Sequence, residues 1–267
     1  MTLSAVLFLF LTHLGIGVAL SLLVVSKAVG VKFFRFNAGL AVILIAVAFV
    51  CRPPEAGATE PGRVALVALA IAEASLVVYW ATVGRILASI RPAIVAMGVG
   101  AGVVALVAQA LAVASGAATL QAMTVASFLS SAALLGGACT AMILGHWYLV
   151  IPSLQVSHLQ SIVKVHIAST LVRVAVVAAA VFLAIATWQP GLGPSFRHYI
   201  LSVGGVFFWQ RVLFGLAGPV LLSYLTWETA KIRSTQSATG ILYVDFFTVV
   251  VGEVLAKYLL LATHVPV

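Results

Sequence analysis

Long runs of apolar residues recur along the whole of this chain, separated by short connections that contain Pro, Gly or small polar residues. A helix needs about 20 such residues to cross the hydrocarbon core of a bilayer. The runs do not alternate between apolar and polar positions, which argues against the strands of a membrane β-barrel. Because lipid offers no hydrogen-bond partners to the backbone, helices are then the remaining solution. The sequence predicts an all-α, polytopic integral membrane helix bundle.

Composition supports the same conclusion and excludes a soluble domain. The chain has 267 residues, of which 63% are hydrophobic and 7% are charged, and its mean hydropathy is +1.22. A water-soluble fold would need a larger polar surface than this composition provides. We expect residues 1–267 to form a single transmembrane domain in contact with the lipid bilayer. The predicted spans, about eight in number, are residues 3–26, 34–51, 64–84, 93–115, 122–147, 162–187, 199–226 and 239–262.

Basic residues are distributed unequally between the two sets of connections. By the positive-inside rule, the richer set is cytoplasmic, which predicts that both termini lie outside and that the protein is a multi-pass component of the cytoplasmic (inner) membrane. The net charge of +8 comes with no basic patch or nucleic-acid motif, so we expect no nucleic-acid partner. The richer set contains Lys27, Lys32, Arg35, Arg85, Arg91, Lys164, Lys231 and Arg233, and the poorer set contains Arg52, Arg63 and Arg197.

Several ionisable residues fall in the middle third of the predicted spans, if each residue advances the helix by ~1.5 Å. An ionisable side chain at that depth costs a few kcal/mol, so it is usually retained for a reason. We expect these residues to meet in one polar site that binds a headgroup or conducts protons. The alternative is a purely structural ion-pair network, since Glu253 and Lys257 are one helical turn apart. The residues are His13, Glu73, Arg173, Arg211 and Glu253.

A quinone fits such a site, because its tail enters from lipid and its two carbonyls need hydrogen-bond donors. Its reduction also moves protons, which requires a carboxylate or an imidazole close to the ring. Aromatic residues precede a cation at mid-depth in the segment from Phe207 to Arg211. Gly215 and Gly218-Pro219 follow, and they loosen the next turn, where a ring could approach the backbone. The predicted quinone ligands are Arg211, Trp209, Arg173 and His13. The predicted catalytic residues are Glu253, Arg211, Glu73 and His13.

Two further histidines allow a different cofactor. His146 ends the fifth span, and His166 lies about one turn into the sixth, so the two imidazoles could face each other and hold a b-type haem. The alternative is a pair of interfacial histidines within an aromatic belt. The cysteines form no cluster, and the sequence predicts no metal site.

The last two spans resemble the membrane anchor subunits of DMSO reductase and polysulfide reductase, the DmsC and NrfD-like families. The resemblance rests on the segment from Arg211 to Pro219, which contains Gly215, and on Gly252-Glu253 followed by Lys257. Lys257 stands where those families usually have arginine. The resemblance implies an eight- or nine-helix subunit that binds quinone or quinol without haem. It also implies an extrinsic iron–sulfur or cytochrome subunit docked on the outer face.

These observations together favour a membrane subunit of a respiratory oxidoreductase complex, which is not catalytic alone. It would exchange electrons and protons between menaquinone or ubiquinone and an extrinsic redox subunit that carries iron–sulfur or multihaem centres. One alternative is a b-type membrane cytochrome. The other is a transporter or proton channel that uses the mid-membrane charges, with Gly218-Pro219 as a break in its helix.

Overall fold

The computed structural model describes residues 2–114, 116–151, 153–188 and 195–267. Over these residues the chain is helical and contains no strand. Eight helical segments are long and apolar enough to cross a membrane. The prediction of an all-α bundle with about eight membrane-crossing helices is confirmed. The first six are α1 (Leu3–Ser21), α2 (Val31–Val50), α3 (Glu60–Thr82), α4 (Arg91–Val113), α5 (Ala118–Val150) and α6 (Val156–Ala186).

The seventh span is interrupted at two points, whereas the sequence predicts one span over residues 199–226 with Gly218-Pro219 as its candidate break. Glycine allows the first break, because a Cβ on Gly205 would collide with the carbonyl oxygen of Ile200. The second break is a turn of π-helix at Leu213–Ala217, directly before Gly218-Pro219. The span consists of α7 (Phe196–Leu201), a 3₁₀ turn (Val203–Gly205), α8 (Val206–Val212), the π turn and α9 (Gly218–Lys231), and α10 (Thr235–Thr263) follows it.

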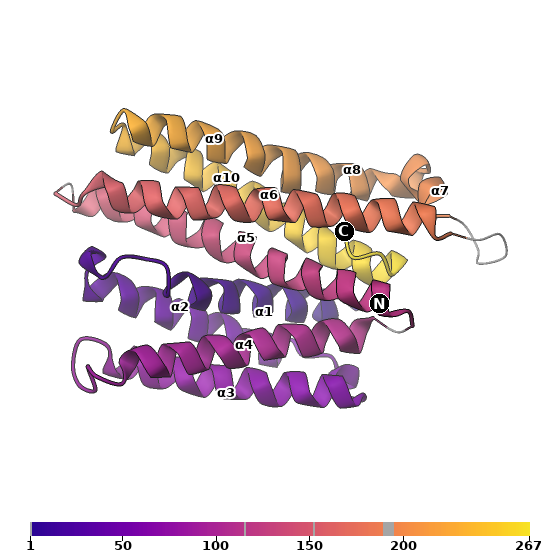
Figure 1. Cartoon of the computed structure of the whole chain (residues 1–267), viewed down its shortest axis with the longest axis horizontal. Helices are drawn as coiled ribbons and strands as arrows, with labels where there is room; N and C mark the ends of the chain where they lie inside the picture. The colour runs from indigo at the N-terminus through magenta and orange to yellow at the C-terminus, as the bar shows by residue number, and fades with distance from the viewer. Residues whose placement is uncertain (1, 115, 152, 189–194) are drawn as a thin grey trace.

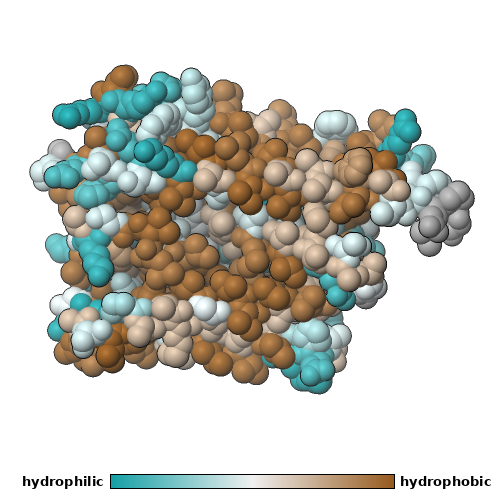
Figure 2. All heavy atoms as spheres, in the orientation of Figure 1, coloured by the Kyte–Doolittle hydropathy of each residue, from teal (hydrophilic) through white to brown (hydrophobic). Residues whose placement is uncertain are grey.

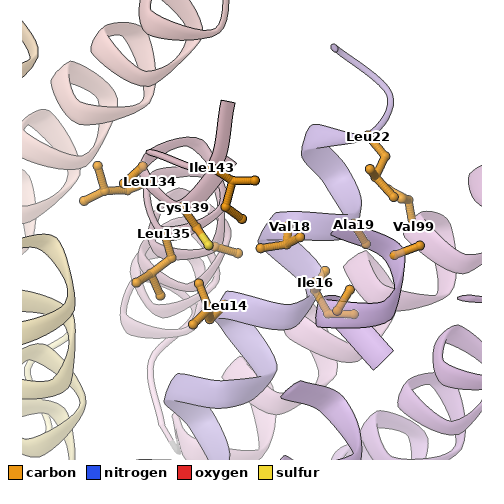
Figure 3. Packing of buried hydrophobic residues seen from close by; sticks show 14 of the residues in the cluster. Leu14, Ile16, Val18, Ala19, Leu22, Val99, Leu134, Leu135, Cys139 and Ile143 are labelled. Carbon is orange, nitrogen blue, oxygen red and sulfur yellow. The ribbon is translucent and has the colours of Figure 1, made fainter. Parts of the chain in front are cut away.

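The helices form two groups of four (Figure 1). In the first half, α1–α4 pack on one another in sequence order, and α4 also contacts α1. In the second half, α5, α6, α9 and α10 pack together. The two halves meet mainly where α1 packs against α5, and Figure 3 shows Leu14 and Val18 of α1 opposite Leu135 and Cys139 of α5.

Close backbone contact holds this seam between the halves. A Cβ added to Gly136 of α5 would collide with the backbone of Gly17 in α1, and one added to Gly17 would collide with the carbonyl of Ala132. Lipid does not drive helices together as water does, so small residues that allow backbones to approach are a common means of association in membranes. The seam therefore depends on glycine at both positions.

The outer surface of the bundle is apolar over a broad central band, with hydrophilic residues gathered at its two ends (Figure 2). Large apolar side chains such as Ile43, Val67 and Phe247 are more than half exposed. A soluble protein would cover such a surface, so this band is the part of the molecule that faces lipid.

The connections between the helices gather at the two ends of the bundle. The basic end contains the connections at residues 22–30, 83–90, 153–155 and 232–234, and the terminal end contains both termini (Figure 1). Helix α5 extends three residues beyond its predicted end, and α6 begins six residues earlier than predicted. Tyr148 secures the connection at the basic end, because its hydroxyl donates to the carbonyl of Gln155 and accepts from the backbone N–H of Leu159.

Candidate functional site: a buried charge cluster

Glu253 of α10 lies at the centre of a group of charged side chains in the interior of the second half. Its Oε1 atom accepts hydrogen bonds from Arg173 Nε at 2.9 Å and from Arg211 Nη2 at 2.8 Å. Arg173 also donates from Nη2 to Oε2 at 3.2 Å, so this arginine binds the carboxylate through two bonds. All three side chains are fully buried. One carboxylate thus connects α10 to α6 and to α8.

Ser131 of α5 extends the cluster towards the first half of the bundle. Its hydroxyl lies 2.5 Å from Glu253 Oε2, 2.7 Å from Lys257 Nζ and 3.1 Å from His13 Nδ1. Lys257 is also 3.4 Å from Glu253, as their spacing of one turn predicts. These contacts bring residues from α1, α5, α6, α8 and α10 into one hydrogen-bonded group, which we call the charge cluster: His13, Ser131, Arg173, Arg211, Glu253 and Lys257.

The contacts of Ser131 indicate which ring nitrogen of His13 carries a hydrogen. A hydroxyl has one hydrogen, and here the nearest acceptor for it is the carboxylate of Glu253. Lys257 can only donate to Ser131, so the remaining contact requires that His13 Nδ1 carries a hydrogen and donates it. In the neutral form of the imidazole, His13 Nε2 is then the unprotonated nitrogen. It is buried and has no hydrogen-bond partner among the described residues.

The charge cluster contains more basic groups than acidic ones. Arg173, Arg211 and Lys257 surround the single carboxylate of Glu253, and the three basic side chains are at most 1% exposed. Arg173 is fully engaged, since it also donates to the Ser127 hydroxyl at 2.8 Å. By contrast, Arg211 leaves Nε and Nη1 without a partner among the described residues. Free donors and excess positive charge in a low-dielectric interior favour an anionic or electron-rich group beside them.

Helix geometry around Gly215 places Arg211 within reach of Glu253. The π turn begins two residues after Arg211, and its Gly215 contacts Gly252, the neighbour of Glu253, so closely that a Cβ on either glycine would collide with the other. The sequence predicts a loosened turn here where a ring could approach the backbone. The turn is loosened, but helix α10 occupies the space beside it. π turns of this kind are frequent at functional sites.

A cavity of about 190 Å³ lies between α1, α3, α4 and α10 at the terminal end. Its walls are mainly apolar and include Phe8, Leu9 and Leu261. Glu55, Thr59 and Gln109 are the polar residues of its lining. Gln109 of α4 is 4% exposed, and both polar atoms of its amide lack a partner among the described residues. An unsatisfied buried amide costs roughly 1–3 kcal/mol. The cavity therefore contains a donor and an acceptor suited to a polar group on an otherwise apolar ligand.

The cavity and the charge cluster are neighbours along two helices. Leu9 precedes His13 by four residues on α1, and Leu261 follows Lys257 by four residues on α10. Four residues advance a helix by ~6 Å and return to nearly the same face. The cavity thus lies about one helical turn from the cluster on both helices.

A second buried pair lies further along α10. His166 Nε2 of α6 is 2.6 Å from Asp245 Oδ2, and both side chains are fully buried. Asp245 precedes Glu253 by eight residues, or ~12 Å of helix. The pair lies on the basic-end side of the charge cluster, so α10 carries two buried acidic groups at successive depths.

Two residues predicted for the site lie elsewhere. Glu73 belongs to α3, in the first half, where it is partly buried and its Oε2 has no partner among the described residues. Its predicted depth is similar to that of Glu253, but α3 packs mainly against α4 and α2. Trp209 is 54% exposed on the outside of α8 and donates from its indole to the Ile200 carbonyl at 3.2 Å. Four predicted residues do come together: His13, Arg173, Arg211 and Glu253.

The two histidines considered as haem ligands do not face each other. The imidazole of His166 packs against Gly137 of α5 and binds Asp245. His146 lies nine residues further along α5, or ~13 Å, and its Nδ1 contacts the Tyr243 hydroxyl at 2.9 Å. Both helices extend further at the basic end than the sequence predicts, which places the two imidazoles at different depths.

Sequence reasoning missed Ser131 and Gln109. Serine is common in membrane spans and costs little there, so Ser131 has no signal of its own among the serines of α5. Gln109 is a neutral amide in an otherwise apolar span, and that isolation is the signal that could have identified it.

No known protein family matches the chain, and no curated protein matches it by sequence. The resemblance of the last two spans to reductase anchor subunits therefore stays a prediction.

Proposed function

We propose that this protein is an integral membrane subunit of a respiratory oxidoreductase complex that binds quinone and exchanges protons with it. The observation that carries the proposal is a fully buried charge cluster one helical turn from a mainly apolar cavity that contains an unpartnered amide. Electrons would come from, or go to, an extrinsic subunit with iron–sulfur or multihaem centres, because the chain has no cysteine cluster for ligating such a centre. Menaquinone and ubiquinone both carry the two required carbonyls, and ubiquinone has the single-ring head.

The cavity between α1, α3, α4 and α10 suits the head of a quinone. A dry protein cavity of ~150 Å³ is large enough for a benzene ring, so about 190 Å³ accommodates a substituted single ring. The amide of Gln109 can donate to a quinone carbonyl, and it can accept from the hydroxyl of a quinol. Both redox states of the ligand then satisfy the amide, which is a requirement for a site that must bind substrate and release product.

In the proposed function, protons move between this cavity and the charge cluster. His13 Nε2 is free to accept a proton, and His13 is linked through Ser131 to Glu253. Quinol oxidation releases two protons with its two electrons, so an unprotonated imidazole at this depth provides the first acceptor. In the reverse direction, protonated His13 supplies the proton that a reduced quinone oxygen takes up. The excess positive charge of Arg173, Arg211 and Lys257 favours the negative charge that develops on that oxygen.

The orientation follows from the basic residues and can be tested separately. If the basic end is cytoplasmic, the cavity beside Gln109 opens towards the outer face, where the extrinsic subunit would dock. A reporter fused after Val267 is then expected to be extracytoplasmic, and one fused after Arg91 cytoplasmic. The opposite pattern would place the docking face in the cytoplasm.

The substitution Gln109→Leu tests the binding site. Leucine fills a similar volume without polar atoms, so the purified protein should be as stable as the native one or more stable. Affinity for a short-chain quinone, measured by quenching of protein fluorescence in detergent, should fall at least tenfold. Gln121→Leu, at the start of α5, is the matched control and should bind normally. Unchanged quinone affinity in a folded Gln109→Leu protein would contradict the proposed site.

A further inference from the structure

A second cavity, of about 380 Å³, lies at the basic end between α1, α2, α3 and α4. Most of its lining is apolar and includes Leu22, Phe34 and Val95. Two basic residues, Lys27 and Arg91, line the same cavity together with Tyr79. The arrangement is amphipathic: an apolar groove in the membrane region is joined to cationic groups at the end of the bundle.

The basic residues at this end of the first half form no ion pair among the described residues. The sequence contains no Asp or Glu in residues 1–54 or 74–227, so Lys27, Lys32, Arg35, Arg85 and Arg91 have no acidic residue near them in sequence. Among the described residues, none of these five forms an ion pair within the chain. Of the five, Lys27 and Arg91 line the cavity, and their positive charge is available to an anionic group from outside the chain.

Arg91 is held in place beside the cavity. Its Nε and Nη2 atoms donate to the Ile86 carbonyl at 2.9 and 2.8 Å. A guanidinium has five N–H groups, so three remain for another acceptor. The same connection exposes Ile86, Leu87 and Ile90, whose side chains are 62%, 42% and 48% exposed. Alternation of arginine with exposed apolar side chains is typical of a segment that lies in the headgroup region of a membrane.

We propose that this cavity is a specific binding site for an anionic phospholipid. One acyl chain would lie along Leu22, Phe34, Val83 and Val95, and the phosphate would contact Lys27 and Arg91. Basic pockets between helices at the cytoplasmic surface bind anionic headgroups in this way. Charge complementarity selects an anionic lipid over a zwitterionic one, and the length of apolar groove selects a lipid over a free anion. The site is independent of the quinone proposal, because it lies at the opposite end of the bundle.

Native mass spectrometry of the purified protein in detergent, titrated with phosphatidylglycerol or phosphatidylcholine, tests the proposal. We expect phosphatidylglycerol to remain bound at concentrations where phosphatidylcholine is lost. Lys27→Gln should reduce the affinity for phosphatidylglycerol about fivefold, and Lys27→Gln with Arg91→Gln should reduce it further. Arg63→Gln, at the terminal end, is the matched control and should bind as the native protein does. Lys27→Gln leaves the bonds between Arg91 and Ile86 intact, so its effect does not depend on refolding of that connection.

Two further measurements make the outcome decisive. A photoreactive phosphatidylglycerol should label peptides that contain residues 22–34 and 79–95, and excess inorganic phosphate should not prevent the labelling. Equal retention of the two lipids, an equal loss in Arg63→Gln, or labelling confined to other helices would overturn the lipid site. Competition by inorganic phosphate would show a free-anion site instead and would also overturn it.

Discussion

The two halves of the bundle satisfy their buried polar groups in different ways. In α2 and α3, Asn37, Ser75 and Thr82 bond to carbonyls one turn back in their own helices, at 2.7–2.9 Å. In the second half, Arg173 and Arg211 bond across helices to Glu253. A bond within one helix leaves that helix free to pack in many ways, whereas a bond between helices fixes their rotation and depth. The arrangement of helices in the first half therefore depends on the fit of their side chains, whereas in the second half it also depends on ion pairs between helices.

Buried polar residues of the first half mostly support single helices, whereas those of the charge cluster form one buried site. Among the described residues of α2–α4, no charged side chain is fully buried, and Gln109 is the buried side chain whose amide has no partner at all. The charge cluster gathers its basic side chains in the second half and takes only His13 from the first. The cavity beside Gln109 lies where the two kinds of packing meet, which is where a ligand can contact an apolar wall and a proton donor at once.

The largest expected effect is that of Glu253→Leu. It removes the carboxylate side chain that Arg173, Arg211 and Lys257 all contact, so each of these buried basic groups loses its bond to Glu253. We expect the free energy of unfolding in mixed micelles to fall by roughly 3–5 kcal/mol. Glu73→Leu is the matched substitution in the first half. Since Glu73 has no ion-pair partner among the described residues, its loss should leave stability unchanged or raise it. Equal losses in both variants would remove the distinction between the halves.

The next effect concerns the seam that joins the halves. Gly136→Ala places a Cβ against the backbone of Gly17, so α1 and α5 must separate, and we expect a loss of roughly 1–3 kcal/mol by the same unfolding measurement. A Cβ on Gly100 of α4 meets no atom within 4 Å. Gly100→Ala should therefore be neutral or stabilising, by up to ~1 kcal/mol. A neutral Gly136→Ala would show that the seam is not closely packed.

Asp245→Asn should have a smaller effect than Glu253→Leu. The amide of asparagine can still pair with His166, although the charge is lost, so we expect a loss of about 1 kcal/mol. Asp245→Leu, which leaves His166 without a partner, should cost more. If the two substitutions cost the same, the hydrogen bond at 2.6 Å does not contribute to stability.

The smallest expected effect is that of His146→Ala. His146 contacts Tyr243 at an exposed position, so stability should change by no more than ~0.5 kcal/mol. The visible absorption spectrum of the purified protein should also be unchanged, because His146 and His166 do not share a site. A haem band that disappears in His146→Ala would contradict the geometry described above.

Much of the fold could be predicted from the sequence, because lipid imposes both a minimum length and an apolar composition on each span. Charged members of the cluster were also predictable, since burial in a membrane is costly and depth can be counted along each helix. The contacts of Glu253 with Arg211 on the preceding span and with Lys257 one turn away were predictable too, whereas the neighbours of Glu73 were not. Glu73 and Glu253 have similar predicted depths, yet they lie in different halves, because an apolar run does not determine which helices become neighbours. The broken seventh span was missed because Gly204-Gly205 lies in a strongly hydrophobic context.

In the proposed function the charge cluster exchanges protons with a quinone, and the substitution Glu253→Gln bears on this claim without changing the shape of the site. Glutamine keeps the shape of the side chain and an acceptor for Arg173 and Arg211, but it removes the charge and the exchangeable proton. The measurement is quinone-linked electron transfer by the complex purified from its native membrane, normalised to the amount of assembled protein. We predict normal assembly and a loss of roughly 100-fold or more in turnover. Full turnover in a well-assembled Glu253→Gln complex would contradict the claim and leave the cluster a structural ion-pair network.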